Sequence, residues 1–467
     1  MDLVARVYSR RQMLRGTGIG LSGILAGGVL SACSADTGDS DADPSAEVIV
    51  VGAGVSGLAA ARHLADNGRR VTILEGRGRI GGRVWTSTVW PDIPVDLGAS
   101  WIHGIDGNPV YEIAEQIRAQ TVVTDGDDIT YYLPDGGETT PAQSQALEAW
   151  GERVADALSD YQDSADTDTS IRAALARAVG AGLDDRDREL LAYNINDLEH
   201  EYSGAAEELS ALFYDSGDPI NGDDVLFPGG YEQITNHLGA DLRVLTGHTV
   251  SGIDWSPSGV VVTTNRGAFN AGQVVVTLPL GVLQSGSVAF AAGLPAVKSK
   301  AINGLGVGVL NKCYLRFPET FWADTDWLGY VPGLDRYGQW AQWINLDRPT
   351  GRPVLLGFNA AQFGRTIEGW TDEQIVEGAM STLRLIYGRE CPDPTGHQIT
   401  RWGSDDYARG SYSFAKVGST PDMREHLAAA IDDRVYFAGE ATDELAPATV
   451  HGAYSSGIRA AREIIGR

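Results

Sequence analysis

The sequence predicts an α/β fold in which a Rossmann-like domain, built around a G-x-G-x-x-G turn, is interleaved with a second domain of mixed sheet and helices. The first indication is the apolar run 48–51, which leads into the glycine turn 52–57 and then into an alanine-rich helix pattern. The second is a pair of distant apolar strand patterns, at 274–278 and 435–438, typical of buried parallel strands. The third is a helical pattern rich in alanine, leucine and acidic residues at 142–213.

The glycine turn has the features of a dinucleotide-binding site. Gly52 permits the tight turn, Gly54 lets a pyrophosphate approach the backbone, and Gly57 lets the helix pack closely on the strand. Free N–H groups and the positive end of the helix dipole then face the phosphates. Glu75 ends a second strand pattern roughly 20 residues further on, where a carboxylate accepts hydrogen bonds from a ribose diol. The spacing predicts an adenine dinucleotide and leaves the reaction open.

Residues 1–32 resemble an export signal. Arg10 and Arg11 precede an uncharged stretch rich in glycine and leucine, which is the pattern of a twin-arginine signal. The stretch ends in a segment that resembles a bacterial lipobox, so we expect either lipidation at Cys33 or simple cleavage of the signal. Residues 33–46 are small and polar, as in a flexible tether. These features predict a protein of the cell envelope, the periplasm or the extracellular space.

Composition restricts the partners of the protein. The chain carries 36 basic and 62 acidic residues, a formal net charge of −26, and such a surface repels nucleic acid and attracts cations. Cys313 lies in an apolar run whose pattern is typical of a buried strand. This position favours a buried, unreactive thiol over a disulfide. No Cys/His cluster has the spacing of metal ligands, so no metal site is predicted. Oligomeric state is left open.

More specific signals follow the glycine turn. The pattern E-x-x-x-R-x-G-G-R extends from Glu75 to Arg83. Its arginines would neutralise a diphosphate, and its glycines would let the backbone approach the edge of a flavin ring. A second glycine-bearing turn at 96–104 adds aromatic and imidazole side chains. Near the other end of the chain, a strand pattern stops at Glu440 and a helix pattern opens at 449–457. The N-terminus of such a helix would stabilise negative charge on a reduced flavin.

In this order, the segments resemble the flavin-dependent amine oxidase superfamily, which includes polyamine oxidases, monoamine oxidases and lysine-specific histone demethylases. The resemblance covers the chain from about residue 46 and is densest at 48–104, 225–322 and 402–460. It implies the amine oxidase fold, with FAD as the cofactor, an amine as the substrate and O2 as the oxidant. The last segment has no cysteine, the residue that attaches the flavin in monoamine oxidases, so FAD is expected to be held non-covalently.

The order of the segments predicts two interleaved domains. The FAD-binding domain is expected to comprise residues 47–110, 225–300 and 400–467, and the substrate domain residues 111–224 and 301–399. The residues expected to bind the cofactor are Gly52, Gly54, Val55, Ser56, Gly57, Glu75, Arg79, Gly81, Gly82, Arg83, Gly98, Ala99, Ser100, Trp101, Val250, Trp402, Gly439, Glu440, Thr449 and Val450.

The resemblance also implies residues for the reaction. The run around Lys312 resembles the strand of polyamine oxidases and histone demethylases whose lysine holds a water against flavin N5; the alternative is a lysine that reaches solvent from a sheet edge. His103, in a W-I-H-G segment, matches the histidine that faces the substrate amine in spermine and acetylpolyamine oxidases. Tyr412 and Tyr454 are expected to form the two walls of an aromatic sandwich, unless they are ordinary core residues.

The leading expectation is therefore a polyamine oxidase-like enzyme. It would remove a hydride from the carbon next to an amine nitrogen and release an aldehyde, a shorter amine and hydrogen peroxide. An L-amino-acid oxidase is an alternative that needs a cation for the substrate carboxylate, for which Arg172 or Arg177 could serve. A monoamine oxidase and a surface flavoprotein without turnover are the others, and the intact Lys312 argues against the last. No membrane contact is expected beyond a lipid on Cys33.

Overall fold

The parallel sheet is assembled from strands that lie far apart in the chain. The computed structural model describes residues 46–179 and 182–466, so the predicted signal and Cys33 lie outside the described residues. The five strands have the order β22-β13-β1-β2-β9, and all neighbours run parallel. They are β1 (Val48–Val51), β2 (Val71–Leu74), β9 (Val244–Leu245), β13 (Gln273–Val276) and β22 (Val435–Phe437). The predicted α/β class with a Rossmann-like sheet is confirmed.

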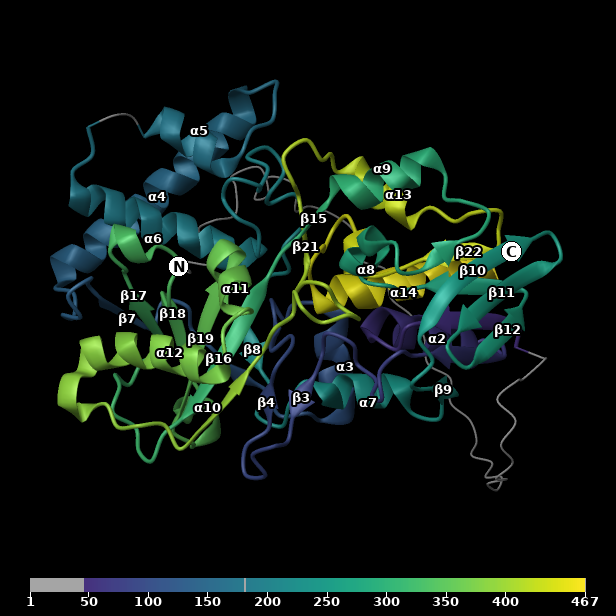
Figure 1. The fold of residues 1–467 in the computed structure, drawn as a ribbon, viewed down its shortest axis with the longest axis horizontal. Helices are drawn as coiled ribbons and strands as arrows, with labels where there is room; N and C mark the ends of the chain where they lie inside the picture. The colour runs from purple at the N-terminus through teal and green to yellow at the C-terminus, as the bar shows by residue number, and fades with distance from the viewer. Residues whose placement is uncertain (1–45, 180–181, 467) are drawn as a thin grey trace.

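Helices from both ends of the described chain cover one face of this sheet (Figure 1). They are α2 (Val55–Asp66), α3 (Pro109–Ile117), α7 (Glu232–Gly239) and α14 (Val450–Ile465). Small residues permit the close approach of α2 and α14, because Ala60 and Ala461 are fully buried between them. A Cβ on Gly457 would lie 2.2 Å from the carbonyl oxygen of Ser56, so this contact requires glycine.

A second sheet covers the opposite face. It has the order β12-β11-β10-β14 and consists of β10 (Val250–Ser256), β11 (Gly259–Thr264), β12 (Gly267–Ala271) and β14 (Ala289–Phe290). Alternate residues of β10 and β11 are buried, as expected for strands with one solvated face. Ile253 and Val262 of this sheet pack in one hydrophobic cluster with Ile49 and Val276 of the parallel sheet.

The other half of the molecule contains a six-stranded mixed sheet with the order β20-β16-β19-β18-β17-β7. Its strands are β7 (Ile129–Tyr132), β16 (Leu310–Arg316), β17 (Trp327–Tyr330), β18 (Gln342–Asn345), β19 (Val354–Ala360) and β20 (Gly396–Ile399). Helix α12 (Asp372–Tyr387) packs on one face through Ile375 and Leu383. Three further helices, α4 (Pro141–Ser164), α5 (Ile171–Ala178) and α6 (Asp185–Tyr202), form a layer beyond the sheet (Figure 1).

Shorter elements complete the two halves and the segments between them. The strands are β3 (Thr86–Ser87), β4 (Val95–Asp96), β5 (Trp101–Ile102), β6 (Val122–Val123), β8 (Val225–Leu226), β15 (Gly306–Val307) and β21 (Ser413–Phe414). The helices are α8 (Leu280–Ser285), α9 (Ala296–Gly304), α10 (Asp347–Thr350), α11 (Ala361–Ile367) and α13 (Asp422–Ala428), with 3-10 turns at η1 (Leu334–Arg336), η2 (Gly388–Glu390) and η3 (Glu440–Thr442). Within the described residues, no helix combines the length and apolarity that crossing a membrane requires.

Candidate active site

A single cavity of about 1690 Å3 runs from the carboxyl ends of the parallel strands to the mixed sheet and the helical layer. Its walls include Gly52 and Glu75 from the parallel sheet, Lys312 from the mixed sheet, and Tyr193 and Glu201 from α6. Binding sites of open α/β sheets lie at the carboxyl ends of their strands, and this cavity starts there. All of the predicted cofactor-binding residues line the cavity except Gly57 and Arg79.

The glycine turn leaves room for a ligand where a phosphate would bind. Gly52 has a φ of 102°, a backbone conformation in which a residue with a side chain would be strained. Gly54 is the N-cap residue of helix α2 and leaves the first N–H groups of the helix without a side-chain acceptor. No atom of the protein lies within 4 Å of the position that a Cβ would take on Gly54, and this position is on the cavity wall. The open turn and the N–H groups that begin α2 therefore fit a dinucleotide pyrophosphate.

Gly57 has a packing role. A Cβ there would lie 2.0 Å from the carbonyl oxygen of Gly52, so helix α2 can approach the turn only with glycine at this position. The first two glycines of the turn therefore shape the ligand site, and the third positions the helix behind it. This division matches the roles that the sequence predicts.

Glu75 is held at the end of β2 by two backbone donors. One carboxylate oxygen accepts the N–H of Ala53 at 2.7 Å, and the other accepts the N–H of Arg77 at 2.7 Å. The side chain is buried and lines the cavity. Each carboxylate oxygen can accept a second hydrogen bond, so the ribose hydroxyls expected at this position can still be bound.

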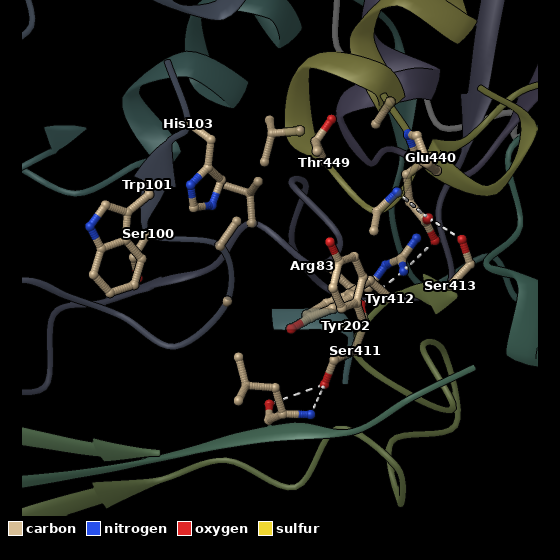
Figure 2. A pocket seen from close by; sticks show the side chains of 18 of the residues that line it. Arg83, Ser100, Trp101, His103, Tyr202, Ser411, Tyr412, Ser413, Glu440 and Thr449 are labelled. Atoms are coloured by element: carbon tan, nitrogen blue, oxygen red, sulfur yellow. Dashed lines mark hydrogen bonds and ion pairs between the residues drawn. The ribbon is translucent and has the colours of Figure 1, made fainter. Parts of the chain in front are cut away.

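A buried ion pair joins the loop after β2 to the C-terminal segment (Figure 2). Arg83 donates to the carboxylate of Glu440 at 3.0 Å and to the carbonyl of Ser411 at 2.9 Å. Glu440 also accepts from Ser413 at 2.7 Å and from the N–H of Ala448 at 3.0 Å. Burial alone would raise the pKa of Glu440, but Arg83, Ser413 and the neighbouring Arg424 hold it below its usual value. The pair fixes the loop on the cavity wall.

The structure corrects the predicted role of Arg79. Its guanidinium does not line the cavity; it donates to the carbonyls of Ile80 at 3.0 Å and Gly82 at 2.8 Å and lies over the ring of Trp85. Arg79 therefore supports the glycine loop from behind. Arg77, two residues after Glu75, does line the cavity, although no sequence pattern indicated it.

Arg77 is bound to a loop from the far end of the chain. Its guanidinium forms a bidentate ion pair with the carboxylate of Asp405, with N–O distances of 2.8 and 2.5 Å. It also lies over the ring of Tyr407, whose hydroxyl contacts the hydroxyl of Thr249 at 2.9 Å. Arg77, Tyr407 and Thr249 all line the cavity, so this loop closes the wall beside Glu75.

Lys312 lies inside the mixed sheet, near the middle of β16, where it pairs with Phe358 of β19. Its side chain is buried, and Nζ donates to the carbonyls of Asp96 at 2.8 Å and Gly98 at 2.6 Å and to the hydroxyl of Ser100 at 2.5 Å. The alternative of a lysine that reaches solvent from an edge strand is therefore excluded. Burial lowers the pKa of Lys312 to about 7, although the negative charge of Asp96 opposes the shift.

His103 follows strand β5, three residues after Ser100, and lines the cavity. Its Nδ1 lies 2.7 Å from the carboxylate of Asp224, a residue that no sequence pattern indicated. The buried His451 lines the same region, and its Nδ1 is 3.5 Å from the side-chain nitrogen of Asn108. The predicted substrate histidine thus belongs to a polar cluster contributed by three segments of the chain.

The predicted tyrosine pair is not assembled. Tyr412 lines the cavity and donates its hydroxyl hydrogen bond to the carbonyl of His200 at 2.8 Å (Figure 2). Tyr454 does not line it: the ring packs in the cluster formed by α2, α3 and α14, because position 454 faces away from the cavity on helix α14. The aromatic residues that share this part of the cavity wall with Tyr412 are Tyr202 and Tyr214, whose rings meet edge to face at 5.2 Å.

A parallel sheet with a dinucleotide turn, joined across one cavity to a sheet that contributes a buried lysine, defines a dinucleotide-dependent enzyme. The model of the family described as flavin containing amine oxidoreductase matches residues 55–465. The chain belongs to this family, and its cofactor is FAD. Of the groups described above, the open turn at Gly54, the carboxylate of Glu75 and the guanidinium of Arg83 are the ones that would hold the cofactor.

Relatives of known name support the same assignment. Polyamine oxidase 2 of Arabidopsis thaliana is 36% identical over 90% of this chain and 88% of its own length. Lysine-specific histone demethylase 1 homolog 1 of Oryza sativa is also 36% identical, but the match spans only 52% of that protein. A redesigned putrescine oxidase has a TM-score of 0.72 at 19% identity, covering 90% of this chain and 99% of its own, and shows the fold. The chain is a flavin-containing amine oxidoreductase.

Proposed function

We propose that the protein oxidises a polycationic amine of the polyamine type. The observation that carries the proposal is the charge of the cavity wall opposite the dinucleotide turn. The acidic residues on this side are Asp125, Glu148, Asp197, Glu201, Asp215, Asp218, Asp223 and Asp224. No arginine or lysine of the described part of 141–202 lines the cavity. A substrate with several ammonium groups would complement this wall.

Two of these carboxylates form no ion pair with an arginine or lysine of the described residues. Glu201 lines the cavity, and its restricted access to water raises its pKa, while the nearby His103 opposes the rise. Asp197 accepts a hydrogen bond only from the amide of Gln342, and burial raises its pKa to about 6. Carboxylates that face a cavity without an arginine or lysine beside them favour a cationic ligand, so an ammonium group of the substrate would be stabilised here.

The chemistry divides between the cofactor and the chain. When bound, FAD would supply the two-electron oxidation of the carbon next to the amine nitrogen, with dioxygen as the final electron acceptor and hydrogen peroxide as its product. The acidic wall orients the remaining ammonium groups of the substrate, and Lys312 fixes the loop 96–100 beside the reacting end. Water then hydrolyses the imine product to an aldehyde and a shorter amine.

The amino-acid oxidase alternative receives no support from the two arginines that could have served it. Arg172 is bound to Glu207 at 2.6 Å and lies over the ring of Tyr337. Arg177 is exposed on α5, and neither residue lines the cavity. On the wall contributed by the described part of 141–202, a substrate carboxylate would therefore meet acidic residues and no arginine or lysine.

The proposal is tested by a peroxide-coupled screen of the purified FAD-loaded protein. Spermine and spermidine are expected to give peroxide at rates well above those of monoamines and L-amino acids. Peroxide from amino acids or monoamines alone would contradict the polyamine assignment. If no amine reduces the flavin under anaerobic conditions, the protein is a binding flavoprotein and the proposed reaction fails.

Glu201→Gln is expected to raise the KM for spermine about tenfold and to change the KM for a monoamine much less. The reason is that the substitution removes one negative charge from the cavity wall at nearly constant side-chain volume, and a tenfold change corresponds to about 1.4 kcal/mol. The matched control is Glu115→Gln, because Glu115 is exposed on α3 and does not line the cavity. Equal effects of the two substitutions, or of Glu201→Gln on both substrates, would contradict the assigned ammonium site.

We also propose that residues 1–33 direct export and lipidation, on the strength of their arginine pair and lipobox-like sequence. Replacing Arg10 and Arg11 with lysine is expected to retain the protein in the cytoplasm. Cys33→Ala is expected to release it from the membrane fraction. Fractionation with immunoblotting distinguishes the two, and a membrane-bound Cys33→Ala protein would contradict lipid anchoring.

A further inference from the structure

His103 is held on the cavity wall by a carboxylate. Asp224 receives the N–H of Gly104 at 2.9 Å on one oxygen and contacts Nδ1 of His103 at 2.7 Å with the other. The side chain of Asn108 donates to the carbonyls of His103 at 3.2 Å and Gly104 at 2.9 Å, so the turn itself is braced. The imidazole therefore has a fixed orientation without any contribution from a substrate.

The contact determines which ring nitrogen carries the proton. Burial alone would raise the pKa of Asp224, but its hydrogen bond to His103 keeps it below the usual value, so the carboxylate is ionised. An ionised carboxylate only accepts hydrogen bonds, and the hydrogen must therefore be on Nδ1. Nε2 of the neutral ring is left as an acceptor, and it has no hydrogen-bond partner among the described residues. The side chain is 53% exposed, within the cavity that it lines.

Three other titratable groups act on His103. Glu201, on the wall contributed by α6, favours its protonation, as does Asp224. His451, on α14, is kept neutral by burial and by the proximity of His103, which lower its pKa to about 4. Burial alone would lower the pKa of His103, but the two carboxylates outweigh burial and raise it. The ring is thus a stronger base than a free imidazole.

We propose that His103 is the base that deprotonates the substrate ammonium and that Asp224 is its positioning residue. An alkylammonium with a pKa near that of a lysine, about 10, cannot give up a hydride until it loses a proton. In this step the N–H bond of the ammonium breaks, the proton bonds to Nε2, and the electron pair remains on the amine nitrogen. His103 keeps its Nδ1–H bond to Asp224 and then releases the new proton to solvent. The inference rests on the proposed function, since it requires an ammonium substrate.

The pH dependence tests the roles of both residues. His103 must be neutral to accept the proton, so kcat/KM of the wild-type enzyme is expected to rise with pH through the pKa of this histidine. Asp224→Asn removes the charge that raises this pKa. The acidic limb of the pH profile, the range in which kcat/KM rises with pH, is therefore expected to move to lower pH by about one unit. Asp224→Glu keeps the charge and is expected to restore the limb. His103→Gln is expected to abolish the limb and to lower kcat/KM about 100-fold.

Asp106→Asn is the matched control, because Asp106 is exposed three residues after His103, does not line the cavity and makes no contact with His103. Titration of the histidines by NMR in the FAD-loaded proteins, with His103→Gln identifying the signal, measures the same pKa without substrate. A limb or an NMR pKa that Asp224→Asn leaves in place, or that Asp106→Asn moves equally, would overturn the proposal. Failure of the wild-type enzyme to oxidise any amine would instead overturn the proposed function and, with it, the role of His103 as its base.

Discussion

Lys312→Met is expected to leave FAD bound and to slow amine-dependent flavin reduction or reoxidation by about 100-fold. Nζ of Lys312 donates three hydrogen bonds to the loop that carries Asp96, Gly98 and Ser100, and this loop forms part of the cavity wall. Methionine has a similar length but no donor, so the loop loses its attachment to the mixed sheet. Anaerobic and aerobic stopped-flow measurements of flavin absorbance separate the two half-reactions.

Lys298→Met provides the matched control. Lys298 is also buried, burial lowers its pKa to about 7, and Nζ donates to the carbonyls of His426 at 3.1 Å and Leu427 at 2.6 Å. It does not line the cavity. Both substitutions are expected to destabilise the fold, because each leaves buried acceptors unsatisfied, but only Lys312→Met is expected to change the flavin rates. Unchanged rates in Lys312→Met, or an equal loss in both variants, would remove the assigned role.

Gly54→Ala is expected to give a folded protein that binds FAD at least about 100-fold more weakly, a loss of about 2.7 kcal/mol. Gly54 has a φ of −74° and a ψ of 176°, which alanine adopts without strain, and no protein atom lies within 4 Å of the new methyl group. The methyl group would instead occupy the space through which the pyrophosphate approaches the backbone. Flavin absorbance after gel filtration and titration with FAD measure the loss.

Gly57→Ala separates the two roles of the glycine turn. Its methyl group would lie 2.0 Å from the carbonyl oxygen of Gly52, so we expect loss of stability by about 1–3 kcal/mol from overpacking. The thermal melting temperature should therefore fall in Gly57→Ala and stay nearly constant in Gly54→Ala. A Gly54→Ala protein that purifies with a full complement of FAD would contradict the phosphate site.

Local sequence patterns were sufficient for the parts of the site that depend on backbone geometry. Gly52 and Gly54 of the turn, the acid at the end of β2, and Arg83 and Glu440 all line the cavity. Each of these features is determined by neighbours in the chain: a glycine needs a particular φ, and a strand ends where its apolar run ends. The same holds for Lys312, whose register in an apolar strand was visible in the sequence.

Side-chain direction on helices and loops was harder to predict. Tyr454 lies one position after Ala453, which does line the cavity, and a step of one residue on a helix turns a side chain by about 100°. Arg79 and Arg77 differ by two positions in one loop, and the sequence gives no signal as to which of them faces inward. Asp224 and Glu201 were missed because their partners come from segments that only the tertiary fold brings together.

The order of the strands has a consequence for biosynthesis. Strand β1 lies next to β13, which pairs on its other edge with β22, and helix α14 packs on α2. A nascent chain that has emerged only as far as the glycine turn therefore lacks an outer strand, the covering helix and the carboxylate partner of Arg83. The complete cofactor site therefore cannot form until strand β22 and helix α14 have been synthesised and have left the ribosome.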